Sequence, residues 1–236
     1  MEHTTAPRNG HEAPAGPAVD HGPARRPERV PIAGTRVLLA PLDPLAHGDS
    51  LFRHIAGPDN PHLWTYMHDG PFADRPAFDE YLRRKASSND PLLFAIVAAE
   101  DGAARGIAAY MRHDPGNRVI EVGNIVYGRA LQRSAAATEA MYLMAAHAFE
   151  TLGYRRYEWK CNALNAPSRA AALRLGFTFE GIFRQHMIVK GRNRDTAWFS
   201  MLDTEWPDRK ARFERWLNPG NFDGAGQQKT RLAAMP

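Results

Sequence analysis

The chain has 236 residues, of which 44% are hydrophobic and 24% charged, enough to build one domain with a sizeable core. No stretch approaches the roughly 20 consecutive apolar residues of a membrane-spanning helix, so we expect a soluble protein with no membrane partner. The net charge is +4, but Lys and Arg are scattered rather than gathered in a stripe, which argues against a nucleic-acid partner. The single cysteine, Cys161, excludes an internal disulfide and suits a cytoplasmic location.

The two ends differ in composition from the rest of the chain. Residues 1–30 are dense in Pro, Gly, Ala, His and Arg without a continuous apolar segment, so we expect a disordered polar tail. The histidines there lack cysteine or carboxylate partners at a metal-binding spacing, and no metal site is predicted. Residues 218–236 are expected to form a flexible C-terminal tail, which leaves one domain over residues 31–217.

In the first half of the domain, apolar spacing predicts a strand and two helices, then a hairpin, a further strand and a long helix. The loop between the first two helices, residues 60–72, carries many aromatic side chains for a connector. The predicted strands are 35–40, 92–99, 105–112 and 119–127, and the predicted helices are 47–56, 78–86 and one that begins near Thr138 and ends at Gly153.

The second half continues with short strands and two more helices. The strands are predicted at 157–161, 177–180, 186–189 and 196–202, and the helices at 168–175 and beyond Trp206. Strands on both sides of the long helix, with hairpins at each side, indicate an α+β fold. We therefore expect a mixed, mostly antiparallel central sheet of six to seven strands flanked by helices.

The densest group of basic residues lies near the last predicted hairpin. Lys190, Arg192 and Arg194 surround Gly191 and Asn193, a pattern typical of a turn between two strands. A solvated turn is favoured here over a phosphate-binding patch.

Residues 121–140 run from a strand into small side chains and then into the long helix. A helix N-terminus presents unpaired N–H groups and a partial positive charge, so a phosphate can bind there if the side chains are small. Ser134, Ala135, Ala136 and Ala137 are small enough. Alone, this pattern fits an ordinary helix start equally well, but a second segment, residues 165–181, makes the pair specific.

Together the two segments resemble the GNAT acyltransferases, whose pyrophosphate loop reads Gln/Arg-x-x-Gly-x-Gly/Ala and is followed by Asn-x-x-Ser and Leu-Gly-Phe. The matching positions are Gln132–Ala137 for the loop, Thr138–Ala140 for the helix start, Asn165 and Ser168 for the second motif, and Leu175–Phe177 with Glu180–Gly181 for the third. The similarity covers residues 31 to 206 and points to the ribosomal-protein N-terminal acetyltransferase branch and its small-molecule relatives. The GNAT fold is the α+β fold expected above.

The resemblance implies acetyl-CoA as co-substrate and no metal. The positions it assigns to acetyl-CoA are Val126 and Tyr127, whose backbone would bind the oxyanion, Gln132, Arg133, Ser134, Ala135, Ala136, Ala137 and Thr138 around the pyrophosphate, and Asn165 along the pantetheine arm. Ala135 stands where the family has glycine. If that position needs a positive φ, the alanine is strained and binding of acetyl-CoA is weakened.

The resemblance also implies two catalytic residues. Glu121 would take a proton from the attacking amine, directly or through water; the alternative is a surface carboxylate paired with a nearby arginine. Ser168 would protonate the departing thiolate; the alternative is that Asn165 and Ser168 only cap a short helix.

Four further residues are predicted to contact the acceptor. Trp64, Tyr66 and His68 lie on the aromatic loop and would form a wall for a flat or cationic molecule, with Arg184 reaching the same cleft. For Trp64 the alternative is an anchor that fixes the loop in the core.

These observations predict an acetyl-CoA-dependent N-acetyltransferase in which the primary amine of a small molecule attacks the thioester directly. A small acceptor is favoured because the aromatic loop suggests a closed pocket. Three alternatives stay open: an acetyltransferase of protein N-termini, a non-catalytic acyl-CoA-binding regulator, and a nucleic-acid-associated protein that binds through its tails. The expected partners are a small-molecule amine or a peptide N-terminus, and the expected state is a monomer or homodimer.

Overall fold

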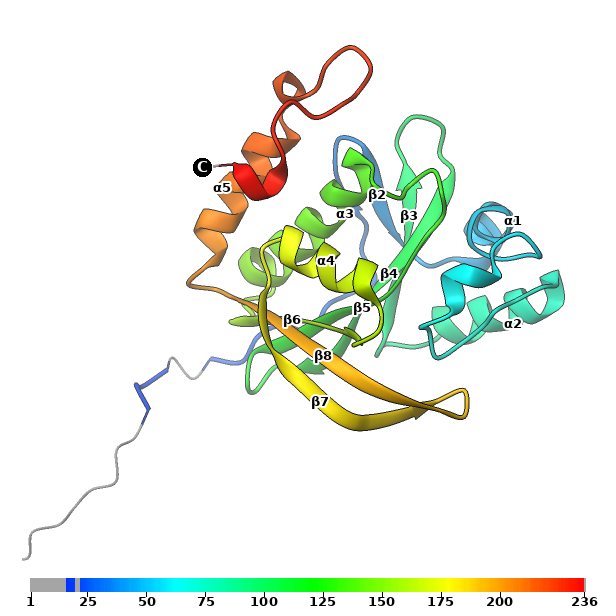
Figure 1. The fold of residues 1–236 in the computed structure, drawn as a ribbon, viewed down its shortest axis with the longest axis horizontal. Helices are drawn as coiled ribbons and strands as arrows, with labels where there is room; N and C mark the ends of the chain where they lie inside the picture. Colours follow the sequence, from blue (N-terminus) through cyan, green and yellow to red (C-terminus); the bar gives the residue numbers. More distant parts are fainter. Residues whose placement is uncertain (1–15, 20–21, 236) are drawn as a thin grey trace, which may run out of the picture.

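One mixed sheet of eight strands forms the centre of the computed structural model, which describes residues 16–19 and 22–235 (Figure 1). The strands are β1 (Ile32–Ala33), β2 (Val37–Pro41), β3 (Leu92–Ala98), β4 (Ala104–Asp114), β5 (Val119–Tyr127), β6 (Arg156–Asn162), β7 (Thr178–Val189) and β8 (Arg192–Leu202). Their order is β1-β2-β3-β4-β5-β6-β8-β7, and only β5 and β6 run parallel to each other. The predicted α+β class is confirmed. The two strands predicted at 177–180 and 186–189 are one strand, β7, and the additional strand is β1, which at two residues is too short to leave a sequence pattern.

Helices cover both faces of the sheet. They are α1 (Pro44–Ile55), α2 (Arg75–Ala86), α3 (Ala135–Ala146), α4 (Ala166–Arg174) and α5 (Trp206–Leu217), with 3-10 turns η1 (Pro61–Trp64), η3 (Pro219–Asn221) and η4 (Leu232–Ala234) and a π-helical turn η2 (His147–Thr151). The first core cluster packs α3 and α5 against one face, where α4 also lies, and the second packs α1 and α2 against the other face of β3 and β4. The described helices include none that is long and apolar enough to cross a membrane.

Side-chain caps explain where four of the helices begin. Asp43 accepts hydrogen bonds from the N–H groups of Leu45 and Ala46 before α1, and Asp74 accepts one from Ala77 in α2. Ser134 and Asn165 do the same at α3 and α4. Each cap satisfies an N–H that the helix itself leaves unpaired.

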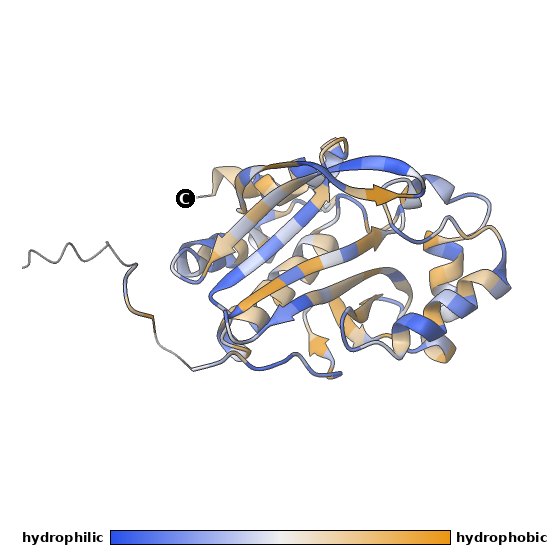
Figure 2. Cartoon of the chain, turned by 90° about the horizontal axis from the view of Figure 1, so that it is seen from below, coloured by the Kyte–Doolittle hydropathy of each residue, from blue (hydrophilic) through white to orange (hydrophobic). Residues whose placement is uncertain are grey.

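Figure 2 shows the hydropathy of each strand, and the face to which a side chain points decides which of the two cores it joins. On β3, Phe94 and Ile96 belong to the α3 cluster, whereas Leu93 and Ala95 belong to the α1–α2 cluster. The continuous apolar run of this strand therefore reflects burial on both faces.

The described parts of the two termini are more ordered than the sequence suggested. Leu232 is 1% exposed in the α3 cluster, and Trp216 packs against Phe222, so residues 218–235 fold onto α5 rather than forming a flexible tail. Near the N-terminus, the backbone of Ala24 and Arg25 hydrogen-bonds to Pro115 and Leu152. The prediction of disorder for residues 1–15 and 20–21 lies outside the described residues.

The sheet opens between β5 and β6. Their parallel pairing runs only from Val119 with Arg156 to Val122 with Trp159, although both strands continue beyond this point. A bulge in β5 falls at the same place, and Asn124 there has a φ of 49°. The facing edges of the two strands are thus left without sheet partners, and an opening passes through the sheet.

Candidate active site

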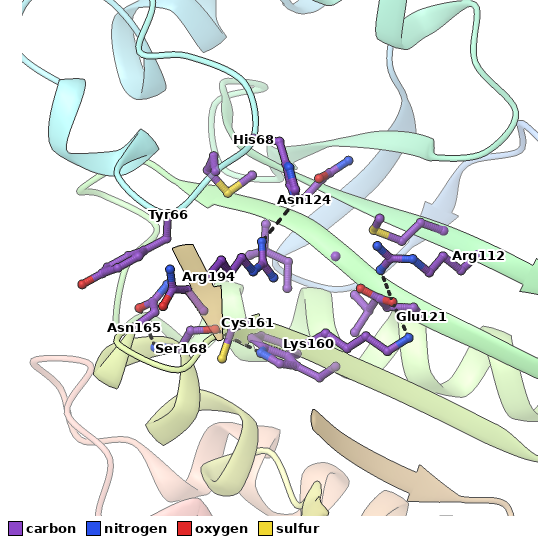
Figure 3. A pocket seen from close by; sticks show the side chains of 17 residues that line it. Tyr66, His68, Arg112, Glu121, Asn124, Lys160, Cys161, Asn165, Ser168 and Arg194 are labelled. Carbon is purple, nitrogen blue, oxygen red and sulfur yellow. Dashed lines mark hydrogen bonds and ion pairs between the residues drawn. The ribbon is translucent and has the colours of Figure 1, made fainter. Parts of the chain in front are cut away.

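A pocket of about 100 Å³ occupies the opening between β5 and β6 (Figure 3). Its walls come from β4, β5, β6, β8, the start of α4 and the loop after η1. The lining residues are Tyr66, Met67, His68, Met111, Arg112, Glu121, Val122, Gly123, Asn124, Ile125, Trp159, Lys160, Cys161, Asn162, Asn165, Ser168 and Arg194. Because side chains of β6 alternate between the faces, Trp159 and Cys161 face α4 while Lys160 faces the opposite side.

The α4 side of the pocket presents the hydroxyl group of Ser168. Trp159 Nε1 donates a hydrogen bond of 3.0 Å to Ser168 Oγ, and the Ser168 N–H donates to Asn165 Oδ1 at 3.1 Å. The tryptophan occupies one lone pair of Ser168, and the side chain of Cys161 is a second hydrogen-bond neighbour of this hydroxyl. Cys161 lies beside it, and burial raises the pKa of the Cys161 thiol, which keeps the thiol protonated at neutral pH.

The opposite side of the pocket holds a buried carboxylate between two cations. Glu121 is 3% exposed, and its Oε2 atom contacts Arg112 Nη1 at 2.6 Å and Lys160 Nζ at 3.0 Å. Within the described residues, Oε1 makes no hydrogen bond. Lys160 also contacts Glu158 at 2.6 Å and lies 3.9 Å from the ring centroid of Trp198, which holds it in place.

Arg194 extends from β8 into the pocket, between the end formed by Tyr66 and Asn165 and the end formed by Glu121 and Arg112 (Figure 3). It is 9% exposed, and its Nη1 atom lies 3.1 Å from His68 Nε2. Burial, followed by the charges of Arg194 and Arg112, lowers the pKa of His68. The imidazole is therefore neutral near pH 7 and accepts this hydrogen bond.

The loop after η1 covers one end of the pocket and is held there by three hydrogen bonds. Besides His68 with Arg194, the Tyr66 hydroxyl donates to the Leu164 carbonyl at 3.2 Å, and Lys190 Nζ donates to the Trp64 carbonyl at 2.9 Å. These contacts join the loop to the β6–α4 connection and to the β7–β8 hairpin.

The predicted pyrophosphate loop lies at the N-terminus of α3. Gln132 Nε2 donates to the Tyr127 carbonyl at 2.9 Å, which closes the turn, and Ser134 caps the helix. The N–H groups of Arg133, Ala135 and Ala136 have no acceptor in the part of the chain that the structure describes. Ala135 is the first residue of the helix, and the positive φ of 58° falls on Arg133 instead. The strain expected for Ala135 is therefore absent.

The structure brings together five of the predicted site residues: Glu121, Ser168, Asn165, Tyr66 and His68. Asn165 is also the cap of α4, so the capping alternative and the pocket position hold together. Thr138 is buried, and its hydroxyl accepts a hydrogen bond from Arg174, so it offers no side-chain group to a phosphate. Val126 and Tyr127 do not line this pocket; the β5 backbone that does is Gly123–Ile125, at the bulge.

Two predicted acceptor contacts lie elsewhere. Trp64 is fully buried, donates to the Ile55 carbonyl at 2.6 Å and packs against Phe72 and Tyr81, so it anchors the loop in the core. Arg184 is exposed on the edge strand β7 and does not line the pocket.

Sequence reasoning missed the pocket cations Arg112, Lys160 and Arg194. The predicted solvated turn is wrong for Arg194, which shares the alternation of Thr196 and Trp198 on β8 and so lies on the same face as Lys160. The sequence shows the alternation of these three residues, but it does not show that this face of β8 is buried. The position of Arg112 could not be predicted from the sequence, because a bulge in β4 and a φ of 52° turn this residue toward Glu121.

Comparison with known proteins gives a family match that spans most of the domain. The family described as "Acetyltransferase (GNAT) domain" matches residues 36–178. YdaF of Bacillus subtilis (strain 168), provisionally named a ribosomal N-acetyltransferase, is 30% identical over 110 residues, which are 47% of this chain and 60% of YdaF. The match therefore spans less than two thirds of that relative.

Solved structures agree over a longer stretch. A GCN5-related N-acetyltransferase from Brucella melitensis is 50% identical with a TM-score of 0.89, covering 91% of this chain and 97% of that one. A structure from Chromobacterium violaceum ATCC 12472, titled a probable acetyltransferase of the GNAT family, is 42% identical with a TM-score of 0.76, covering 83% and 98%. The chain belongs to the GNAT family of acetyltransferases.

Proposed function

We propose that this acetyltransferase moves an acetyl group from acetyl-CoA to the primary amine of a small molecule, by direct attack of the amine on the thioester. The observation that carries the proposal is the pocket between β5 and β6. The free Oε1 atom of Glu121 and the Ser168 hydroxyl are presented to this one pocket from opposite faces of the sheet.

The acetyl-CoA side of the proposal rests on the start of α3 and the facing edges of β5 and β6. The free N–H groups of Arg133, Ala135 and Ala136, together with the helix dipole, suit a pyrophosphate. From there the unpaired backbone edges offer hydrogen bonds to an extended amide-containing arm, as a neighbouring strand would. Such an arm leads to the pocket beside Ser168.

On the acceptor side, Glu121 Oε1 takes the proton that the amine loses as its nitrogen bonds to the thioester carbon. Two cations on Oε2 fix the orientation of the carboxylate while leaving Oε1 accessible. The carbon–sulfur bond breaks, and Ser168 supplies a proton to the departing sulfur. The proton held at Glu121 returns to Ser168 through water, so the site is restored.

Direct attack is favoured over an acetyl-enzyme because the chain has one cysteine. Cys161 lies in the pocket, but burial raises the pKa of its thiol, and a protonated thiol is a weak nucleophile. A small acceptor is favoured because the pocket is only about 100 Å³ and the loop after η1 closes it by three contacts.

The test is release of CoA thiol from acetyl-CoA in the presence of amino acids, polyamines, aminoglycosides and short peptides, beside calorimetry of acetyl-CoA binding. Thiol release that depends on a small amine supports the proposal. Release with peptides alone would instead favour an acetyltransferase of protein N-termini. Binding of acetyl-CoA without turnover on any amine would favour a binding-only regulator, and absence of binding would contradict both.

A further inference from the structure

Arg194 is a buried cation that contacts no carboxylate of the described residues. Its exposed fraction is 9%, and it makes no ion pair with any described residue. The Nη1 atom contacts the neutral His68, and the Nε atom is buried with no hydrogen-bond partner. Burying an uncompensated charge costs several kcal/mol unless a counter-ion completes the site.

The neighbouring charges already satisfy one another. Arg112, Lys160 and Arg156 contact the three carboxylates of Glu121, Glu158 and Glu180 in an unbroken series across β4, β5, β6 and β7. Three cations thus meet three carboxylates. Arg194 stands outside this series, which leaves the acceptor side of the pocket with an excess positive charge.

His68 does not neutralise that excess. Its ring is held neutral by burial and by the two nearby guanidinium groups, so it orients Arg194 without supplying negative charge. With one edge of the guanidinium held by His68, the unpartnered Nε edge remains for a ligand. Arginine offers two parallel N–H donors along such an edge, which matches the two oxygens of a carboxylate.

We propose that the acceptor is a small amine that also carries a carboxylate, and that Arg194 binds this carboxylate while the amine lies beside Glu121 Oε1. Both side chains line the same pocket of about 100 Å³, so a short molecule spans them. This inference rests on the acetyl transfer proposed above. Under it a polyamine is a poor acceptor, because its second cation would face Arg194 and Arg112 rather than an anion.

The experiment compares matched acceptors in the CoA-release assay. Glycine, β-alanine and 4-aminobutyrate are each paired with the corresponding amide, and 1,4-diaminobutane is added as the dication. A charge-assisted contact to a buried guanidinium predicts a kcat/KM that is about 10- to 100-fold higher for at least one amino acid than for its amide. We expect 1,4-diaminobutane to be the poorest acceptor.

Variants test whether Arg194 is the cause. Arg194→Gln is expected to bring the ratio of amino acid to amide close to one, with KM for acetyl-CoA unchanged and with the amide still acetylated. Arg194→Lys restores the charge but not the planar pair of donors, so it should recover part of the ratio. Arg184→Gln is the matched control, since Arg184 is an exposed arginine on the adjacent strand, outside the pocket.

The outcomes separate this inference from the proposed function. If no amine is acetylated, the proposed function fails, and the inference with it. If amines are acetylated but amino acids and amides react equally, or 1,4-diaminobutane reacts best, the function stands and the carboxylate inference is overturned. If Arg194→Gln keeps the ratio, or loses affinity for acetyl-CoA instead, Arg194 does not bind the acceptor carboxylate.

Discussion

Replacing Glu121 by glutamine should separate its structural role from its catalytic one. The carboxylate is 3% exposed and holds two cations, and removing one partner of a buried ion pair costs about 3–5 kcal/mol. The lower end of this cost applies for two reasons. Lys160 retains its ion pair with Glu158, and Arg112, which is 45% exposed, can be solvated by water. A loss of about 3 kcal/mol corresponds to a fall in Tm of roughly 6–12 °C for a chain of this size.

The catalytic consequence should be larger than the structural one. Glutamine keeps the shape of Glu121 but cannot take a proton, so kcat should fall by about 10²- to 10⁴-fold, the usual contribution of a general base. Thermal unfolding and steady-state CoA release, measured on the same preparation below the Tm of the variant, give the two quantities. A variant that is destabilised but fully active would refute the assigned role.

Glu158→Gln is the matched control for this prediction. Glu158 is 7% exposed, lies beside Glu121 on β6 and also holds two cations, Arg156 and Lys160, but it does not line the pocket. We expect a similar fall in Tm with kcat changed only a few-fold. Equal losses of kcat in the two variants would mean that the ionic series acts only by holding the pocket together.

Three other changes have expected outcomes. Ser168→Ala should lower kcat by about 10²-fold with KM for acetyl-CoA nearly unchanged, because it removes the proton donor; an unchanged kcat would contradict this. Truncation after residue 217 should lower the denaturation midpoint, since burial of Leu232 alone contributes about 1.5–3 kcal/mol. Burial lowers the pKa of His113 and His147, so the unfolded state binds more protons below pH ~6.5 and Tm should fall from pH 7.5 to 5.5; a constant Tm would contradict this.

The sequence predicted what depends on local pattern. Apolar periodicity located the strands and the long helix, although α3 begins at Ala135, after the cap Ser134, rather than near Thr138. The paired motifs predicted Glu121, Asn165 and Ser168, which the fold brings into one pocket although 44 residues separate Asn165 from Glu121 along the chain. These positions are fixed by how each element begins or ends, which neighbouring residues decide.

What could not be predicted depends on long-range packing. Trp64 has the same aromatic character as Tyr66, and only the packing of α2 against η1 decides that one is buried while the other lines the pocket. Arg194 resembles the exposed Arg192 in sequence, but the register of β8 with β6 and the contact with His68 bury it. The C-terminal residues lack helical periodicity, and their order comes from Leu232 docking in a core formed by distant segments.

The position of the CoA sulfur in a structure of the complex tests the central claim most directly. The claim is that acetyl transfer takes place in the opening between β5 and β6. It predicts the pyrophosphate at the N–H groups of Arg133, Ala135 and Ala136 and the sulfur within about 3.5 Å of Ser168 Oγ, a reactive separation. A sulfur that lies outside the β5–β6 opening, out of reach of both Glu121 and Ser168, would contradict the account.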